Sequence, residues 1–224
     1  MHSHLLPGID DGATDLEDSM QIILHLKELG YHRFITTPHI FWDMYRNTPD
    51  IIREKLAIVK EELIRRQIPV EIEAAAEYYC DEHFEKEIEA QTLLTFGTKK
   101  YVLFEISFAQ ENVNLGRAIF NMRLAGYTPI LAHPERYEFW HGDFRKYESM
   151  LDKDVHLQLN INSLTGQYGP DTRRISERLI DRGMITFLGS DCHHMGHVQL
   201  MNTARTHPYF KKLIDSGNLL NAEL

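Results

Sequence analysis

Two histidines and two acidic residues stand close together in the first dozen residues of the chain. His2 and His4 are two residues apart, so in an extended segment their imidazoles point to the same side. Asp10 and Asp11 follow after a Pro-Gly turn. Neutral imidazole nitrogens and carboxylate oxygens are ordinary ligands for zinc, manganese and iron. This segment therefore predicts one part of a site for a divalent metal ion.

Further histidines and acidic residues stand where strand-like runs end later in the chain. They are His39, Glu77, Glu105, His133, Asp191 and His193. A single histidine at a strand end is more often a surface residue than a ligand, but the same coincidence on several strands favours a shared site. With His2, His4 and Asp11 the set holds nine candidate ligands. Nine ligands exceed what one ion takes, so two or three ions are expected.

The chemistry that such a set favours is hydrolysis of a phosphoester. Three divalent ions would outweigh the four carboxylates of the set and attract a phosphate dianion. A divalent ion lowers the pKa of a coordinated water from about 15.7 to about 7, which provides a hydroxide nucleophile at neutral pH. Arg136 follows His133 by three residues, and its planar guanidinium matches phosphate oxygens. Pairing of Arg136 with Glu135, or capping of the following helix, is the alternative role.

The hydrophobic pattern alternates between strand-like and helix-like segments along the whole chain. Strands are expected over residues 33–37, 70–79, 101–104, 128–132, 156–160 and 184–188, and helices over 14–29, 48–67, 81–91, 112–125, 142–152, 171–182 and 199–215. Only Met1 precedes His2, so a first strand there is expected to be very short or to include upstream residues. This alternation predicts a parallel sheet with right-handed crossovers. One closed or nearly closed β/α barrel over residues 1–224 fits better than two domains, and barrels gather functional groups at the C-terminal ends of their strands.

Composition and charge exclude several classes of protein. Charged residues make up 25% of the chain and hydrophobic residues 43%, as in soluble globular proteins. No apolar run has the length of a membrane span and no signal peptide is present, so a cytoplasmic protein without membrane insertion is expected. The formal net charge of −9 argues against extended contact with nucleic acid.

Catalysis by a cysteine nucleophile is disfavoured by the surroundings of the two cysteines. Cysteine-based tyrosine phosphatases need an arginine six positions after the cysteine, so that the loop encloses the phosphate around the thiolate. Lys86 stands at that offset from Cys80, and Val198 stands at that offset from Cys192. The two cysteines also show no pairing pattern of a disulfide framework.

Several short motifs together resemble a known superfamily. They are His-Ser-His at the start, Thr-Pro-His at 37–39, Glu77, Glu105, His-Pro-Glu-Arg at 133–136 and Ser-Asp-x-His at 190–193. This set is similar to the polymerase-and-histidinol-phosphatase (PHP) superfamily. The opening His-Ser-His-Leu-Leu-Pro-Gly-Ile-Asp-Asp-Gly and the later Ala-His-Pro-Glu-Arg-Tyr more closely resemble the metal-dependent bacterial tyrosine phosphatases of capsule and exopolysaccharide operons, the CpsB/YwqE type.

This resemblance implies a fold, a site and a substrate. The fold would be a distorted TIM-like barrel of seven β/α units, (β/α)7. One ion would be held by His2, His4, Glu77 and Asp191, a second by Glu77, Glu105 and His133, and a third by Asp11, His39 and His193. Manganese would be preferred, although iron or zinc can occupy such sites. Arg136 would bind the phosphate, and Asp11 and His39 would join it in catalysis. The substrate would be phosphotyrosine in a protein, with the tail of a bacterial tyrosine kinase that governs polysaccharide export as the expected partner.

One departure from the family pattern and two rival functions accompany this prediction. The family often has a further arginine shortly after Ser-Asp-x-His, whereas here 194–198 contains none and the first later arginine is Arg205. Rate and substrate preference are therefore expected to differ from those of relatives.

The first rival function is another PHP enzyme, either a small-molecule phosphatase such as one for histidinol phosphate or, less favoured by the acidic charge, a nuclease. The second rival is a catalytically inactive metal-binding regulatory protein.

Overall fold

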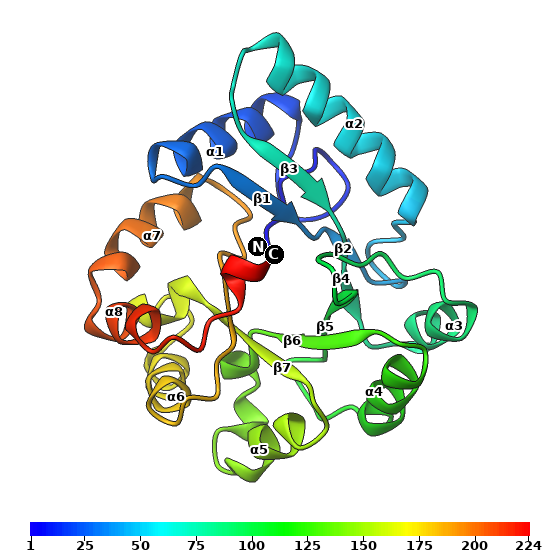
Figure 1. Cartoon of the computed structure of the whole chain (residues 1–224), viewed down its shortest axis with the longest axis vertical. Coiled ribbons are helices and arrows are strands. Elements are labelled where there is room, and N and C mark those ends of the chain that lie inside the picture. The colour runs from blue at the N-terminus through cyan, green and yellow to red at the C-terminus, as the bar shows by residue number, and fades with distance from the viewer.

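The computed structural model describes residues 1–224, in which helices and strands alternate along the chain (Figure 1). The strands are β1 (Arg33–Thr36), β2 (His39–Ile40), β3 (Glu71–Ala74), β4 (Glu77–Tyr79), β5 (Tyr101–Glu105), β6 (Thr128–Ala132), β7 (His156–Asn160) and β8 (Phe187–Gly189). The α-helices are α1 (Leu16–Glu28), α2 (Pro49–Arg65), α3 (Glu82–Ala90), α4 (Leu115–Leu124), α5 (Arg145–Leu151), α6 (Pro170–Asp181), α7 (Met195–Thr206) and α8 (Pro208–Asp215). Short 3-10 helices are η1 (Pro134–Arg136), η2 (Glu138–Trp140), η3 (Ile161–Thr165) and η4 (Asn221–Glu223). None of the helices is long and apolar enough to cross a membrane.

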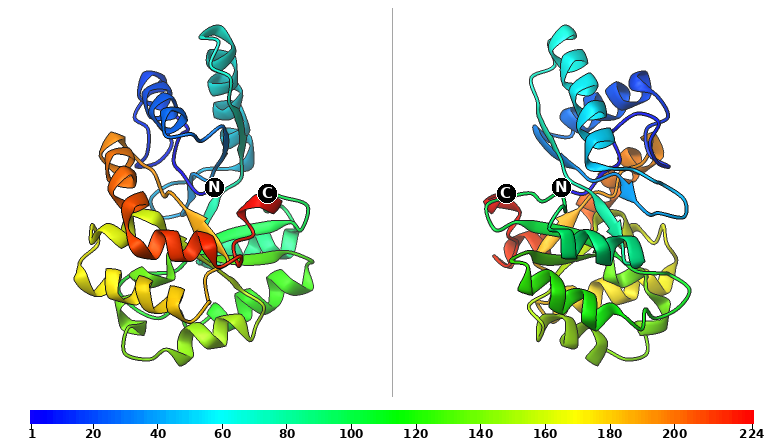
Figure 2. Two further views of the ribbon diagram at one scale, coloured as in Figure 1. Left: turned by 60° about the vertical axis from the view of Figure 1, so that its left-hand side comes forward. Right: turned by 90° about the vertical axis from the view of Figure 1, so that its right-hand side faces the viewer.

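All the strands pair in parallel, and they form two sheets. The larger sheet has the order β2-β4-β5-β6-β7-β8, and β1 pairs with β3 in the smaller one. Figure 1 shows the strands at the centre of the molecule and the helices around them. Two further views place α1 and α2 together at one end, with α1 packed against both α2 and α7 (Figure 2). The predicted α/β class with parallel pairing is confirmed.

The first residues of the chain connect the two sheets. Ser3 forms a parallel bridge with Cys192, which follows β8, and the carbonyl oxygen of Ser3 accepts a hydrogen bond from the amide of Thr37, which follows β1. The predicted first strand is reduced to this single bridge, because His2 has a left-handed backbone with φ of 59°. His2 and His4 nevertheless reach the same place, since their Nε2 atoms are 3.5 Å apart.

The strands divide the buried side chains between two faces. Along β5, Val102 and Phe104 belong to the large core under the helices, whereas Tyr101 and Leu103 belong to a smaller apolar cluster on the other face of the strands. Period-2 alternation then places Glu105 on the same face as Leu103, beyond the end of that apolar cluster. The inward face of the sheet therefore changes from apolar to acidic toward the C-terminal ends of the strands.

The interpretation of residues 70–79 as one strand is wrong, because the pairing is interrupted. β3 pairs with β1 as far as Ala74, and β4 begins at Glu77 as a partner of β2 and β5. Pro38 lies opposite the interruption and has no N–H to donate to a continuous ladder.

Two further predicted boundaries also differ from the structure. The strand predicted at 184–188 is shifted to β8, because the amide of Met184 is used to close the end of α6 on the carbonyl oxygen of Leu179. The single helix predicted at 199–215 begins earlier, at Met195, and is divided into α7 and α8 at Pro208. Pro208 has no N–H for an α-helical hydrogen bond, so it starts the second helix at its first turn.

Candidate metal centre

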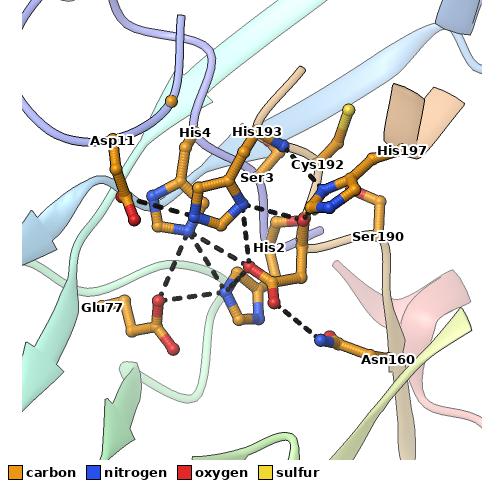
Figure 3. Close-up of polar contacts among 12 residues, drawn as sticks. His2, Ser3, His4, Asp11, Glu77, Asn160, Ser190, Cys192, His193 and His197 are labelled. Carbon is orange, nitrogen blue, oxygen red and sulfur yellow. Dashed lines mark hydrogen bonds and ion pairs between the residues drawn. The ribbon is translucent and has the colours of Figure 1, made fainter. Parts of the chain in front are cut away.

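The structure brings all nine predicted ligands to one place, at the C-terminal edge of the sheet. His2 and His4 lie in the connecting segment, Asp11 in the following loop, His39 at the start of β2, Glu77 at the start of β4, Glu105 at the end of β5, His133 directly after β6, and Asp191 and His193 after β8. Figure 3 shows side chains from the two ends of the chain facing one another there. The expected positions of His39 and Glu77 at strand ends differ from the structure, because the interruptions after β1 and β3 make each of them the first residue of a short strand.

Glu77 occupies the centre of this cluster. Its Oε2 atom is 3.1 Å from His2 Nε2, 3.4 Å from His4 Nε2 and 3.4 Å from His39 Nδ1. Its Oε1 atom is 2.9 Å from His133 Nε2. The side chain is fully buried, and a buried carboxylate without a compensating charge is strongly unfavourable. Glu77 therefore depends on positive charge at the surrounding nitrogens or on cations between them.

The donor atoms fall into three overlapping groups, and within each group all ligand atoms lie within 4.8 Å of one another. The groups are His2, His4, Glu77 and Asp191; His4, Asp11, His39 and His193; and His39, Glu77 and Glu105. His133 approaches the third group through Glu77 and through Glu105, whose Oε2 is 3.7 Å from its Nε2. Imidazole nitrogens and carboxylate oxygens at these spacings fit divalent transition-metal ions. The role of each residue as a ligand remains a prediction.

The pKa values of His2 and Asp191 also indicate that the buried carboxylates of the cluster need positive charge beside them. Burial disfavours the charged form of His2, but the carboxylates of Glu77 and Asp191 outweigh it and raise the pKa of His2 to about 10. Burial likewise disfavours ionisation of Asp191, yet the imidazoles of His2 and His193 hold its pKa well below the ordinary value. Without cations the imidazole of His2 therefore carries a proton at neutral pH. Since a metal ligand must be a neutral imidazole, binding of a divalent ion to His2 would release that proton.

Three polar residues behind the cluster orient its members. His2 Nδ1 hydrogen-bonds to Gln158 Oε1, and His4 Nδ1 lies 2.8 Å from Asp10 Oδ2. Asn160 Nδ2 donates to Asp191 Oδ2 at 2.6 Å. An acceptor at Nδ1 fixes the proton there and leaves Nε2 free to face the cluster.

Two of these orienting residues were missed by the sequence prediction although a signal was present. Gln158 and Asn160 alternate with Leu157 and Leu159 in β7, and all four side chains are buried. Polar residues on the inward face of a fully buried strand need a specific partner. Asp10 was recognised only as a neighbour of Asp11, and the structure places it behind His4 instead.

Removal of the acceptor on Gln158 is expected to weaken metal binding by about 10- to 100-fold, the usual effect of losing an outer hydrogen-bond partner. Gln158→Met keeps the length of the side chain but leaves His2 Nδ1 without its partner. Metal titration against a competing chelator measures the affinity, and Gln21→Met on the exposed face of α1 is the matched control. An unchanged affinity in Gln158→Met would contradict the orienting role.

Arg136 ends η1 and lies at the side of the cluster. Its Nη1 donates to Asp191 Oδ2 at 3.1 Å. Its guanidinium carbon lies 4.5 Å from the ring centre of Phe108 and 4.4 Å from that of Tyr168, so the group is held between two aromatic rings. The alternative pairing with Glu135 is wrong, because Glu135 is fully buried and accepts from Asn160 N and Ser163 Oγ.

A pocket of about 480 Å³ opens onto the cluster beside Arg136. Aromatic and apolar side chains form much of its wall, namely Phe41, Met44, Tyr45, Tyr79, Phe108 and Tyr168. Phe41 stacks on Tyr79 at 4.0 Å and Tyr45 stacks on His39 at 5.5 Å, so the wall adjoins the ligands directly. His194 and His197, which the sequence prediction left out of the site, also line this pocket.

Neither cysteine is suited to act as a nucleophile. Burial raises the pKa of the Cys192 thiol to about 12 and that of the Cys80 thiol to about 12. Both groups are therefore protonated at neutral pH, and the thiolate is the reactive form. This agrees with the prediction that a cysteine mechanism is disfavoured.

Comparison with known proteins places the chain in a family. Residues 1–213 match the family model described as "Capsular polysaccharide synthesis, CpsB/CapC". The chain belongs to the CpsB/CapC family. It is 30% identical over 199 residues to the tyrosine-protein phosphatase YwqE of Bacillus subtilis, covering 87% of this chain and 77% of that protein. It is 24% identical over 200 residues to the tyrosine-protein phosphatase CpsB of Streptococcus agalactiae serotype V, covering 87% of this chain and 82% of that protein.

The fold of this CpsB/CapC chain is also similar to a solved structure. It is described as "Crystal structures of YwqE from Bacillus subtilis and CpsB from Streptococcus pneumoniae, unique metal-dependent tyrosine phosphatases". The superposition has a TM-score of 0.84 at 27% sequence identity, over 95% of this chain and 88% of that chain. The predicted family resemblance is thereby confirmed.

Proposed function

We propose that this chain is a metal-dependent phosphatase that hydrolyses phosphotyrosine in proteins and regulates the synthesis of capsular or other extracellular polysaccharide. The observation that carries the proposal is the convergence of nine imidazole and carboxylate side chains, with Glu77 at their centre, beneath a pocket that Arg136 also lines. The names of the relatives, tyrosine-protein phosphatases in a family of capsular polysaccharide synthesis, support the same function.

The ligand assignment that we propose is close to the three groups of donor atoms, but it places His133 instead of His39 beside Glu77 and Glu105 and gives His4 to the first ion alone. His2, His4, Glu77 and Asp191 would hold one ion, Glu77, Glu105 and His133 a second, and Asp11, His39 and His193 a third, with manganese preferred over iron or zinc. Divalent ions bound there would acidify the attacking water and balance the charge of the phosphate.

The chain's own residues would bind the phosphate and position the reacting groups. The contact with Asp191 fixes Arg136, whose remaining N–H groups are free to bind phosphate oxygens. Asp11 is the most exposed of the nine, with 52% of its side chain accessible, and lies within 3.5 Å of His39 and of His193. Partial burial opposes ionisation of Asp11, but these imidazoles lower its pKa to about 2. Asp11 is therefore an ionised carboxylate at neutral pH, and we assign Asp11 and His39 to catalysis as the residues that hold the reacting groups at the open side of the cluster.

The aromatic wall of the pocket favours an aromatic leaving group. A phenyl ring gains contact with rings such as Phe41, Tyr45 and Phe108, whereas the side chain of histidinol phosphate offers less apolar area.

The protein substrate that we propose is the tail of a bacterial tyrosine kinase in the cytoplasm. We propose further that the whole chain, residues 1–224, is a single domain with the distorted (β/α)7 barrel of PHP proteins, which the connection of the two sheets through Ser3 supports.

Turnover of three substrates under one metal condition tests this function. A phosphotyrosine peptide is expected to exceed histidinol phosphate in kcat/KM by at least about tenfold, the size of effect that differential contacts in an apolar pocket supply, and single-stranded DNA is expected to remain uncut. A preference for histidinol phosphate would replace the proposal with a small-molecule phosphatase. A fully metal-loaded protein that is inert on all three would favour the regulatory protein instead.

A further inference from the structure

Tyr168 is held against the pocket by its own loop. It lies between η3 and α6, and the glycines on either side, Gly166 and Gly169, have φ of 84° and 97°. L-residues rarely adopt such angles, so the two glycines allow a tight loop that directs the tyrosine inward. The ring of Tyr168 stacks on Arg136 and lines the pocket above the cluster.

The hydroxyl of Tyr168 is a donor without an acceptor. It is buried and makes no hydrogen bond of normal geometry. Burial and the nearby carboxylate of Asp191 raise the pKa of Tyr168 far above its ordinary value, so the group keeps its proton. The nearby Asn160 amide already has other partners, because its Oδ1 accepts from Gln158 Nε2 and its Nδ2 donates to Asp191 Oδ2. A buried polar group of this kind in a native structure calls for a partner that the chain does not provide.

We propose that Tyr168 is a second phosphate-binding residue, whose hydroxyl donates a hydrogen bond to a non-bridging phosphate oxygen on the side of the pocket that holds Arg136. This inference rests on the proposed function and adds a residue to the site of that function. The same side chain then has two roles. Its ring, opposite Phe108, holds the guanidinium plane, and its hydroxyl provides a second donor to the anion. A non-bridging phosphate oxygen accepts a hydrogen bond from this hydroxyl only when substrate or product is bound.

Tyr168→Phe separates the hydroxyl from the ring. We expect this variant to bind inorganic phosphate about tenfold more weakly than the wild type, the usual effect of losing a hydrogen bond to a charged group. Calorimetric titration of the manganese-loaded protein with phosphate measures the affinity without turnover. The manganese content and the midpoint of thermal unfolding are expected to remain those of the wild type.

Two further variants make the result specific. Tyr147 in α5 also has a buried hydroxyl without a partner, but it lies outside the pocket, so Tyr147→Phe is the matched control and should bind phosphate normally. Tyr168→Leu removes the ring as well and should bind phosphate more weakly than Tyr168→Phe. Wild-type affinity in Tyr168→Phe, with a loss only in Tyr168→Leu, would overturn the proposal and leave Tyr168 as a support for Arg136.

This experiment also distinguishes the inference from the proposed function. If the wild type binds phosphate and Tyr168→Phe binds it about tenfold more weakly, the inference stands on binding alone. If the wild type binds phosphate but fails to hydrolyse phosphotyrosine, the proposed function fails independently of Tyr168.

Discussion

Glu77→Gln is expected to abolish phosphatase activity, with a loss of kcat/KM of at least about 10³-fold, well beyond the 10- to 100-fold effect of removing an outer partner. The carboxylate of Glu77 faces four imidazoles, those of His2, His4, His39 and His133, and contributes to two of the three groups of donor atoms. Glutamine has nearly the same shape but no charge, and its amide nitrogen cannot act as a ligand. The variant should therefore lose metal ions as well as activity, which elemental analysis of the purified protein measures.

The matched control for this substitution lies on α3. Glu87 is half-buried, one of its carboxylate oxygens has no partner, and burial raises its pKa to about 7, but it does not line the pocket. Glu87→Gln makes the same change to a partly buried acid and should keep its metal content and its activity. Full metal content and activity in Glu77→Gln would contradict the central position that we assign to Glu77.

Complete removal of metal ions is the second change with a large expected effect. Chelation should abolish hydrolysis and lower the midpoint of thermal unfolding by more than about 10 °C. A ligand at 1,000 times its Kd stabilises the folded state by about 4 kcal/mol per site. For a chain of this length each kcal/mol shifts the midpoint by about 2–4 °C. The carboxylates of Glu77 and Asp191 are buried, and apart from the surrounding imidazoles only Arg136, beside Asp191, can balance their charge, so they are expected to gain strongly from bound ions. Thermal scans and peptide assays before and after chelation, and after addition of Mn²⁺, measure both effects.

A cysteine variant provides the contrast to chelation. Cys192 is buried directly beside the cluster, where Ser3 pairs with it, and its thiol is protonated at neutral pH. Cys192→Ser should therefore keep the activity of the wild type, and chelators should abolish that activity in the variant as they do in the wild type. The reverse result, activity lost in Cys192→Ser and resistant to chelation, would exclude the metal mechanism.

Much of the fold follows from patterns that are local in the sequence. The strands at 128–132 and 156–160 have their predicted bounds, because each is an apolar run between clear turns. The side chains of Asp15 and Thr48 accept hydrogen bonds at the N-termini of α1 and α2, a position where aspartate and threonine are common. The meeting of the nine candidate ligands also follows from a simple rule, since the C-terminal ends of parallel strands lie at the same edge.

Other features depend on partners that lie far away in the chain. The interruption between β3 and β4 arises opposite Pro38, and the late start of β8 arises because Met184 closes α6. The roles of Gln158 and Tyr168 were not predicted for the same reason. The alternation in β7 marks Gln158 as a polar residue that needs a partner, but that partner is His2, 156 residues earlier, and the partner of the Tyr168 ring is the distant Arg136. Local periodicity carries no information on such long-range contacts.

The most direct test of the central claim is anomalous X-ray diffraction at the manganese absorption edge from crystals of the manganese-loaded protein. We predict two or three strong peaks between the side chains that surround Glu77, each at coordination distance from imidazole nitrogens and carboxylate oxygens. A manganese-loaded crystal with no peak between these side chains, or with peaks only elsewhere in the molecule, would contradict the claim.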